Sequence, residues 1–285
     1  MEVHATPEAF RAACDAARAG GRRVGLVPTM GALHDGHLAL VDHARAAGAD
    51  YRAVTIFVNP LQFGEGEDFG RYPRTLEADL EACRARGVDC VFTPTPDVMY
   101  PEGFATSVRV TGVTERLEGA HRPGHFDGVT TVVAKLFHAT GPCVAVFGRK
   151  DYQQWRVLAR MTRDLGLPVE IVGHPIVRER DGLALSSRNR YLDPDARQRA
   201  LGLVEGLRAA ADAWDAGERD VARLEGLART PVEARFDRID YVAAADPESL
   251  APLPERAEQM VLLMAAHLGG TRLIDNLELG VDPRP

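Results

Sequence analysis

The chain is expected to fold as an α/β protein, with a doubly wound, Rossmann-like parallel sheet domain followed by a smaller α+β C-terminal domain. Two observations lead to this expectation. Up to about residue 175, short apolar runs alternate with longer segments of helical periodicity, as in a parallel sheet covered by helices on both faces. Beyond that point, helical segments precede three strand-like runs. We therefore expect domains of residues 1–175 and 176–285.

The predicted elements follow in chain order. Thr6-Pro7-Glu8 starts the first helix, with a capping hydroxyl, a proline in the first turn and an acid at the positive end of the helix dipole. A strand at 24–27 then leads through a short loop into a helix that opens at His37. Further strands are expected at 51–58, 88–92, 143–147 and 169–172, further helices at 75–86, 129–139 and 152–165, and short strand-like pieces within 94–126. In the second domain we expect helices over 194–216 and 221–229 and strands over 239–244, 259–266 and 272–276.

Composition excludes several classes of protein. The net charge of −7 and the pI near 5.7 argue against a dedicated nucleic-acid binder, which usually carries a basic surplus. No apolar run is long enough for a membrane span, and no secretory leader is recognisable. The four cysteines form no C-x-x-C pair, so we expect reduced, mostly buried thiols in a cytoplasmic protein.

The loop between the strand at 24–27 and the following helix carries the first candidate chemistry. Gly31 and Gly36 permit a close backbone approach, and the helix N-terminus favours phosphate. His34 and His37 lie three residues apart at the helix entrance, where imidazoles can donate hydrogen bonds to phosphate oxygens during attack at phosphorus. Taken alone, the two histidines are also compatible with ordinary core or surface positions. The His-x-Gly-His pattern resembles the ATP-handling signature of the nucleotidyltransferase superfamily.

The segment after the strand at 51–58 carries a second candidate site. Asn59-Pro60 could simply form a turn with a solvent-facing Gln62. Alternatively, the neutral amide of Gln62 can orient a carboxylate without the strong ion pair that an arginine would form. A carboxylate held in this way remains able to attack as a nucleophile. Phe63 and Met30 would supply an apolar wall.

Two later loops carry cationic candidates. Lys150 follows the strand at 143–147 and can reach phosphates, and Gln154 in the next helix is a second neutral amide. Ser186, Ser187 and Arg188 combine two hydroxyls with a guanidinium, a set suited to closing over a triphosphate. The alternatives are a surface lysine and a polar interdomain loop.

Seven stretches together resemble the pantothenate synthetase (pantoate–β-alanine ligase) family. They lie in the family's order and span both predicted domains. The matching stretches are PTMGALHDGH at 28–37, FVNPLQF at 57–63, RYPRTL at 71–76, EGAHRPGHFDGV at 118–129, FGRKDYQQ at 147–154, GLALSSRNRYL at 182–192 and RLIDN at 272–276.

The resemblance implies a two-step ligation. The carboxylate of pantoate attacks the α-phosphate of ATP to give pantoyl adenylate and pyrophosphate, and the amine of β-alanine then displaces AMP to give pantothenate. Activation is needed because a carboxylate is a poor acyl donor until its oxygen belongs to a good leaving group. The resemblance also implies Mg²⁺ with ATP, a homodimer, and a C-terminal domain that closes over the ATP site.

The family's pattern assigns roles residue by residue. His37 is the catalytic acid-type residue with His34 as its helper, and Lys150 and Arg188 complete the catalytic set. Gln62, Gln154, Met30 and Phe63 fall at the pantoate site, and Gln62 also at the β-alanine site. Arg122 and Tyr72 match residues near the substrates. The ATP site comprises Met30, Gly31, Ala32, Leu33, His34, Asp35, Gly36, His37, Gly148, Arg149, Lys150, Asp151, Val177, Leu185, Ser186, Ser187 and Arg188.

Few positions depart from the family's pattern. Arg149 stands where Glu is more usual, which changes the charge beside Lys150, and Leu185 replaces Met. The Mg²⁺ ligands are not readable from the sequence, because phosphates and water can hold the ion; Asp79 is the one candidate.

Three other functions compete with this interpretation. A nucleotidyltransferase acting on a phosphorylated acceptor is disfavoured by the two neutral glutamines. RNA charging is disfavoured by the acidic net charge. A catalytically inactive nucleotide-binding regulator is disfavoured because His34, His37, Lys150 and Arg188 are all present.

Overall fold

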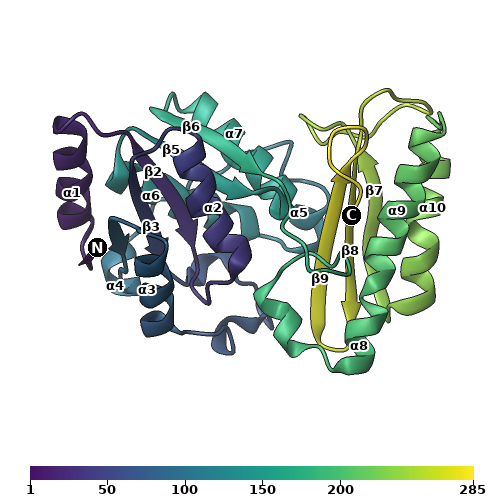
Figure 1. Cartoon of the computed structure of the whole chain (residues 1–285), viewed down its shortest axis with the longest axis horizontal. Coiled ribbons are helices and arrows are strands. Elements are labelled where there is room, and N and C mark those ends of the chain that lie inside the picture. The colour runs from purple at the N-terminus through teal and green to yellow at the C-terminus, as the bar shows by residue number, and fades with distance from the viewer. The chain divides into compact units, whose positions relative to one another are not determined.

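The computed structural model describes residues 1–285, and the chain divides into two compact units (Figure 1). Unit 1 comprises Met1–Arg149 and Gln154–His174, and unit 2 comprises Lys150–Gln153 and Pro175–Pro285. Unit 1 contains a six-stranded parallel sheet and unit 2 a three-stranded antiparallel sheet, which confirms the predicted fold class. The short segment Lys150–Gln153 packs with unit 2, although the strands before and after it belong to unit 1.

The sheet of unit 1 has the strand order β1-β4-β3-β2-β5-β6. The chain moves from β2 outward to β3 and β4, and then returns to the other side of β2 with β5. The strand order therefore reverses between β2 and β5, where doubly wound proteins bind their ligands. The strands are β1 (Glu2–His4), β2 (Val24–Thr29), β3 (Tyr51–Ile56), β4 (Cys90–Phe92), β5 (Cys143–Gly148) and β6 (Val169–His174).

Pairing between β2 and β5 ends early at this point. Gly25 and Leu26 pair with Val144 and Ala145, whereas the β2–β3 pairing continues to Thr29. Pro28 has no N–H to donate to a neighbouring strand. The carboxyl ends of β2 and β5 are therefore not joined by a continuous ladder where the following loops begin.

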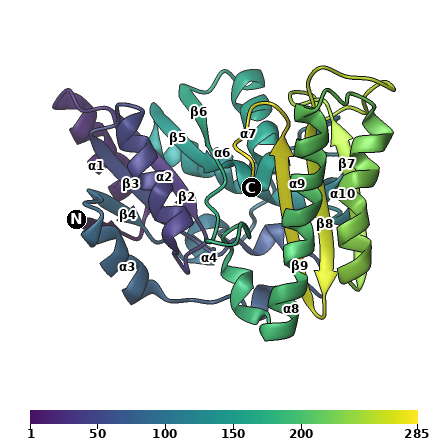
Figure 2. The ribbon, with the colours of Figure 1, turned by 45° about the vertical axis from the view of Figure 1, so that its right-hand side comes forward.

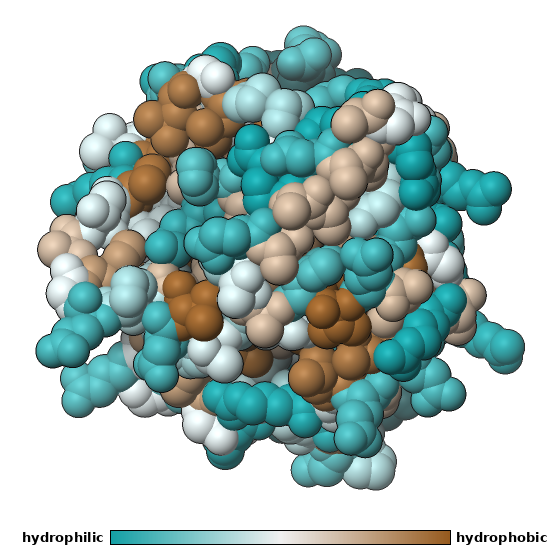
Figure 3. Space-filling view, turned by 90° about the vertical axis from the view of Figure 1, so that its left-hand side faces the viewer, coloured by the Kyte–Doolittle hydropathy of each residue, from teal (hydrophilic) through white to brown (hydrophobic).

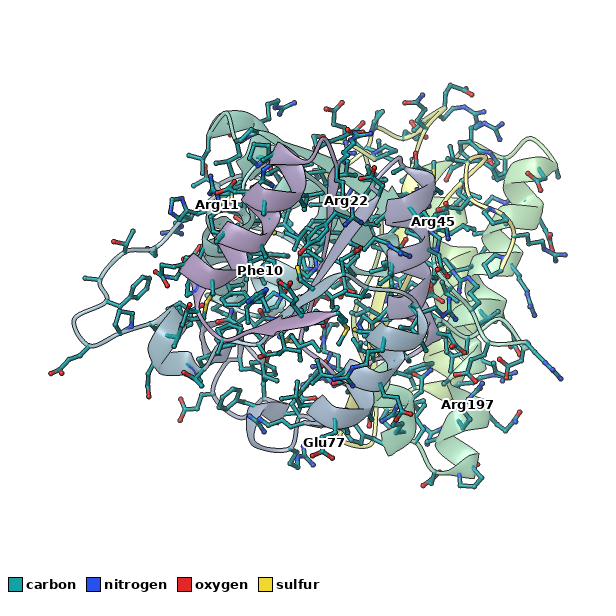
Figure 4. The ribbon with its side chains drawn as sticks, turned by 60° about the vertical axis from the view of Figure 1, so that its left-hand side comes forward. Phe10, Arg11, Arg22, Arg45, Glu77 and Arg197 are labelled. Carbon is teal, nitrogen blue, oxygen red and sulfur yellow. The ribbon has the colours of Figure 1, made fainter.

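Helices cover both faces of this sheet, as strand alternation requires. Leu26 and Ala53 face a core shared with α1, α6 and α7, whereas the adjacent Val27 and Val54 face α2 and α3. Figure 4 shows Phe10 of α1 directed into the first core, where its ring stacks on Phe92 at 5.0 Å. These helices are α1 (Pro7–Ala19), α2 (Asp35–Ala46), α3 (Leu76–Ala85), α6 (His125–Thr140) and α7 (Tyr152–Asp164).

The sequence-based assignment was wrong in a few places. The edge strand β1 was not predicted, because three residues show too little alternation. No strand forms between residues 94 and 126; the helices α4 (Pro96–Met99) and α5 (Glu118–His121) lie there instead, and α6 starts four residues earlier than expected. The single helix predicted over 194–216 is interrupted at Ala200 into α8 (Pro194–Arg199) and α9 (Leu201–Asp215).

Unit 2 is an antiparallel sheet covered by two helices. The strands β7 (Arg238–Ala245), β8 (Val261–Leu268) and β9 (Thr271–Glu278) pair in sequence order. In Figures 1 and 2, α9 and α10 (Val221–Arg235) lie side by side along this sheet. Their apolar side chains and those of the sheet, such as Leu207, Leu224 and Met264, form one core. The remaining turns are 3₁₀ segments: η1 (Pro60–Gln62), η2 (Asp68–Gly70), η3 (Arg149–Asp151) and η4 (Ser187–Tyr191).

The burial of the thiols agrees with the expectation from composition. All four cysteines are free and buried. None of the helices has both the length and the apolar character that a membrane crossing demands. On the face shown in Figure 3, hydrophobic side chains form small separate patches within a mostly hydrophilic surface.

Candidate active site

The loop after β2 has a strained backbone that is held by one carboxylate. Gly31 and Ala32 both have positive φ, at 83° and 50°, a conformation that is unfavourable for a residue with a side chain. The carboxylate of Asp79 on α3 accepts the backbone N–H groups of Ala32 at 2.9 Å and Leu33 at 2.8 Å. The strained loop therefore depends on a buried anchor from a different helix.

These contacts bear on the suggestion that Asp79 binds Mg²⁺. Both of its oxygens already accept hydrogen bonds from the loop, Oδ1 also accepts one from Thr75 Oγ1 at 3.2 Å, and the residue is 2% exposed. No group of three or more histidine, cysteine, aspartate or glutamate side chains is arranged to hold a metal ion. The geometry favours Asp79 as a positioning residue of the loop.

His34 and His37 cap the N-terminus of α2 reciprocally. The Nδ1 atom of His34 accepts the N–H of Gly36 at 3.1 Å, and the Nδ1 atom of His37 accepts the N–H of His34 at 3.4 Å. Their ring centroids are 4.0 Å apart. An Nδ1 that accepts carries no proton, so the neutral form of each ring has its N–H at Nε2. Each imidazole thus offers Nε2–H as its donor, at a helix end that already favours an anion. Asp35 is exposed in the same first turn.

Gln62 and Met30 lie together, as the predicted pantoate site requires. The amide Nε2 of Gln62 donates to Met30 Sδ at 3.2 Å, and its Oε1 accepts from Asn59 Nδ2 at 3.0 Å. Asn59 is 1% exposed and also donates to the carbonyl of Gly128 at 3.1 Å. A Cβ at Gly128 would lie 2.2 Å from the Leu61 carbonyl oxygen, so only glycine allows α6 to approach this turn so closely. Asn59 and α6 thus set the position of Gln62.

A polar network holds the backbone beyond Gln62. Arg122 makes two hydrogen bonds of 2.7 Å to the carboxylate of Glu67, and its Nη1 lies 3.1 Å from His125 Nε2. The other ring nitrogen of His125, Nδ1, is 2.8 Å from the Gln62 carbonyl oxygen. A carbonyl can only accept, so His125 donates from Nδ1 and accepts at Nε2. Burial and the charge of Arg122 lower the pKa of His125 to about 4, which keeps the ring neutral and this pattern intact.

Aromatic side chains gather beside the same loop. Phe63 packs edge-on against Tyr72, with ring centroids 5.9 Å apart, and Phe69 lies 5.3 Å from Phe63. Tyr72 is 6% exposed. Phe63 therefore contributes to an apolar cluster, and its place in the apolar wall of the pantoate site stays a prediction.

The remaining unit 1 candidates follow β5. Gly148 ends that strand and pairs with His174, and the Arg149 guanidinium carbon lies 5.4 Å from the ring centroid of Trp155. Gln154 is the third residue of α7. Met30, Gln62 and Gln154 thus follow the carboxyl ends of three adjacent parallel strands, β2, β3 and β5, which end at the same edge of the sheet.

The cationic candidates Lys150 and Arg188 belong to unit 2. The carbonyl of Lys150 accepts a 2.8 Å hydrogen bond from Asn276 Nδ2 on β9. The predicted nucleotide residues Val177 and Leu185 are joined by a 2.9 Å backbone hydrogen bond, and Ser186 Oγ accepts the N–H of Arg188 at 3.2 Å. These bonds place Ser186, Ser187 and Arg188 directly after a closed turn. Asp151 is exposed beside Lys150.

Several supporting residues had no role in the sequence-based prediction. The residues are Asn59, Glu67, His125, Arg178, Asp275 and Asn276. Four of the six lie within the matching motif stretches, whereas Glu67 and Arg178 lie four residues from the nearest stretch. Their partners are distant in sequence, so only the fold reveals what they hold.

Comparisons with known proteins agree over nearly the whole chain. The family model "Pantoate-beta-alanine ligase" matches residues 2–278. A pantothenate synthetase of Anaeromyxobacter dehalogenans is 54% identical over 281 residues, covering 96% of this chain and 97% of that protein. A crystal structure of the Thermus thermophilus pantothenate synthetase has a TM-score of 0.91 at 48% identity, and covers 99% of this chain and 100% of that one.

A third relative was solved with ligands. The pantoate-beta-alanine ligase of Francisella tularensis, complexed with β-γ ATP and β-alanine, has a TM-score of 0.81 at 31% identity and covers 98% of this chain and 97% of that one. The chain therefore belongs to the pantoate-beta-alanine ligase family, and the condensation of pantoate with β-alanine is its reaction.

Proposed function

We propose that the protein performs this condensation in two steps through pantoyl adenylate, with ATP as the activating substrate. The reciprocal capping of α2 by His34 and His37 carries the proposal. It holds two imidazole Nε2–H donors at a helix N-terminus, which is the arrangement needed to stabilise growing negative charge on phosphate oxygens. An acyl phosphate route would release ADP instead of AMP.

In the first step, a pantoate carboxylate oxygen attacks the α-phosphorus of ATP, an O–P bond forms, and the bond to pyrophosphate breaks. His37 donates from Nε2 to an oxygen of the phosphate under attack, and His34 assists it. Hydrogen bonds to oxygens whose charge increases in the transition state lower the barrier more than they strengthen ground-state binding.

Pantoate is held by neutral groups. We place its carboxylate and hydroxyls on the amides of Gln62 and Gln154, with Met30 and Phe63 as the apolar wall. In the second step the amine of β-alanine, held near Gln62, attacks the acyl carbon, AMP leaves, and the nitrogen loses a proton. Because Gln62 is uncharged, it can orient a carboxylate without suppressing its nucleophilicity.

The nucleotide is bound by segments of both units in this proposal. In unit 1 the segment from Met30 to His37, with Gly148 and Arg149, surrounds ATP. In unit 2, we assign Lys150, Asp151, Val177 and the segment 185–188 to the nucleotide, with Lys150 and Arg188 balancing phosphate charge. Mg²⁺ enters with ATP as part of the substrate and is held by phosphates and water.

The proposal extends to the state of the protein in the cell. We infer a homodimer in the cytoplasm, where the four free, buried cysteines remain reduced. Sedimentation equilibrium of the purified chain tests the dimer: a single species at the monomer mass across micromolar concentrations would contradict it.

Product analysis tests the two-step route. Purified protein is incubated with ATP, Mg²⁺ and pantoate, with and without β-alanine. We expect pyrophosphate with pantoate alone and AMP with pantothenate once β-alanine is added. ADP and phosphate would refute the adenylate route, and ATP binding without turnover would favour the regulator considered above.

A further inference from the structure

Asp275 and Asn276, to which the sequence analysis assigned no role, lie on β9. Through the contacts described below, they hold two segments of unit 2: the Lys150 segment, which is Lys150–Gln153, and the Ser186–Arg188 segment. Both residues are 2% exposed. Successive residues of a strand direct their side chains to opposite faces of the sheet, so one pair on one strand can hold two different segments. Neither side chain is required by the hydrophobic core.

Asn276 contacts the Lys150 segment. Its Nδ2 donates to the Lys150 carbonyl at 2.8 Å. Nearby, the hydroxyl of Tyr152 lies 3.1 Å from the Pro247 carbonyl oxygen and 3.0 Å from Glu278 Oε2, which is also on β9. These contacts explain why Lys150–Gln153 packs with unit 2. The backbone from which the Lys150 side chain extends is therefore held from β9.

Asp275 contacts Arg178, which precedes the Ser186–Arg188 segment in the chain. Arg178 makes a two-pronged ion pair with its carboxylate, at 2.7 and 2.9 Å, and the side chains are 14% and 0% exposed. The same guanidinium donates to the carbonyls of Gly182 at 2.9 Å and Asn276 at 3.3 Å. A buried two-pronged pair fixes orientation as well as distance.

Arg178 in turn supports the turn that carries Ser186, Ser187 and Arg188. It forms an antiparallel bridge with Ala184, and the N–H of Glu179 donates to the Leu183 carbonyl at 2.8 Å. Asn189 closes the far side, donating to Glu179 Oε1 at 2.8 Å and to the Ala184 carbonyl at 3.1 Å. The ion pair with Asp275, together with the hydrogen bond from Arg178 to the Asn276 carbonyl, links this turn to the sheet.

From these contacts we infer that Asp275 and Asn276 are positioning residues, which hold the Lys150 segment and the Ser186–Arg188 segment in register for phosphate binding. The inference rests on the proposed roles of Lys150 and Arg188. One strand sets the spacing between the two cations. A shift of about 1 Å at such groups can reduce a rate on the order of 100-fold, so the strand acts on catalysis without touching substrate.

A double-mutant cycle tests whether Asn276 acts by positioning Lys150. The rate of pantoate-dependent adenylate formation is measured for Asn276→Ala, Lys150→Ala and the double variant. We expect Asn276→Ala to lower this rate by about 10-fold to 100-fold with the KM for pantoate unchanged, and to have little further effect once Lys150 is absent. Leu277→Ala, a core change at the next position of β9, is the matched control and should affect thermal stability but not the rate below the unfolding temperature.

The cycle distinguishes a failure of the proposed role of Lys150 from a failure of the inference about Asn276. If Lys150→Ala leaves adenylate formation unchanged, the proposed role of Lys150 fails. If Lys150→Ala lowers the rate and Asn276→Ala lowers it by its full factor in both backgrounds, Asn276 does not act through Lys150 and the inference is overturned. A rate loss in Leu277→Ala equal to that in Asn276→Ala would equally overturn it, because general loosening of unit 2 would then explain both.

The role of Asp275 is tested with variants of Asp275 and of its ion-pair partner Arg178. Asp275→Asn leaves a buried guanidinium without its counter-charge and can prevent folding, so Arg178→Lys is used as well, since it keeps the charge but loses the two-pronged geometry. Both variants should lower adenylate formation in the wild-type background and have little effect in Arg188→Ala. Unchanged rates in a folded Arg178→Lys variant would contradict the role of the pair.

Discussion

The two units present different chemistry at their proposed substrate-binding segments. In unit 1 the side chains are imidazoles and amides, namely His34, His37 and Gln62, which donate hydrogen bonds without requiring a full charge. In unit 2 they are Lys150 and Arg188, supported by the buried ion pair of Arg178 with Asp275. Neutral donors suit atoms whose charge changes during reaction, and cations suit phosphate charge that persists throughout. In the proposal, unit 1 therefore supplies mostly neutral donors to the carboxylate and the phosphate that react, and unit 2 adds cations for the polyphosphate.

The largest effect is expected at His37. His37→Ala should lower adenylate formation by about 10²–10³-fold while ATP affinity changes much less, because the hydrogen bond strengthens only in the transition state. Single-turnover kinetics and ATP titration measure the two quantities. The exposed His138 gives a matched control, His138→Ala.

Two conservative variants separate the functions of the ring. His37→Asn retains an acceptor for the His34 N–H but loses the Nε2–H donor, so it should be nearly as slow as His37→Ala. His37→Gln places a donor near Nε2 and should recover part of the rate. Equal losses of ATP affinity and rate in His37→Ala would contradict the transition-state role.

The neutral network of unit 1 should make stability depend on pH through His125. In the unfolded chain this histidine binds a proton below about pH 6.5, whereas burial and Arg122 lower its pKa in the folded protein to about 4. The unfolded state therefore binds more protons within this window, and the free energy of unfolding should fall by up to about 3 kcal/mol as the pH drops from 6.5 towards 4.

Urea unfolding of the wild type and of His125→Asn measures this contribution. Asparagine keeps a donor to the Gln62 carbonyl but does not titrate in this range. The wild type should therefore lose more stability than His125→Asn between pH 7 and pH 5. Parallel losses in the two proteins would show that His125 is not responsible.

Asp79 is expected to have a smaller effect, and one on stability rather than on metal binding. Asp79→Asn removes one of the two acceptors for the Ala32 and Leu33 N–H groups and should lower the free energy of unfolding by about 2–3 kcal/mol. Chemical denaturation measures this, with Glu77→Gln on the exposed face of the same helix (Figure 4) as the control. A raised Mg²⁺ requirement at unchanged stability would instead support Asp79 as a metal ligand.

Gln62 tests whether a neutral anchor holds pantoate. Gln62→Ala should raise the KM for pantoate by about 10-fold, the loss of a hydrogen bond to a charged group, and Gln62→Glu should raise it further through repulsion between carboxylates. The exposed Gln259 provides the control variant Gln259→Ala. Wild-type pantoate kinetics in Gln62→Ala would refute the neutral-anchor argument.

The smallest effect is expected for the outer ion pairs of unit 2. Arg197, labelled in Figure 4, pairs with Glu179 at 2.7 Å and Asp181 at 2.8 Å, but the carboxylates are about one-third exposed, at 32% and 39%. Arg197→Ala should lower the free energy of unfolding by at most about 1 kcal/mol, and less at high salt. A loss of about 3–5 kcal/mol, the cost expected for removing one partner of a buried pair, would remove the distinction between the buried and exposed pairs.

Most of the fold was predictable because its determinants are local. Periodicity identified the parallel strands and long helices, and the Thr6 cap of α1 was correct because the hydroxyl accepts from Ala9, three residues away. The errors occurred where local signals were short or mixed: the three-residue edge strand β1, the irregular segment 94–126, and the break at Ala200.

The sequence by itself determined which residues could carry the chemistry, because histidine, amide and cation motifs are contiguous and have characteristic spacing. Only the tertiary structure decided what holds them. Asp79 anchors a loop 46 residues away, and Asn276 holds Lys150 across 126 residues. Such pairings depend on how strands and helices pack, and no local pattern encodes them, so the supporting residues became visible only in the folded chain.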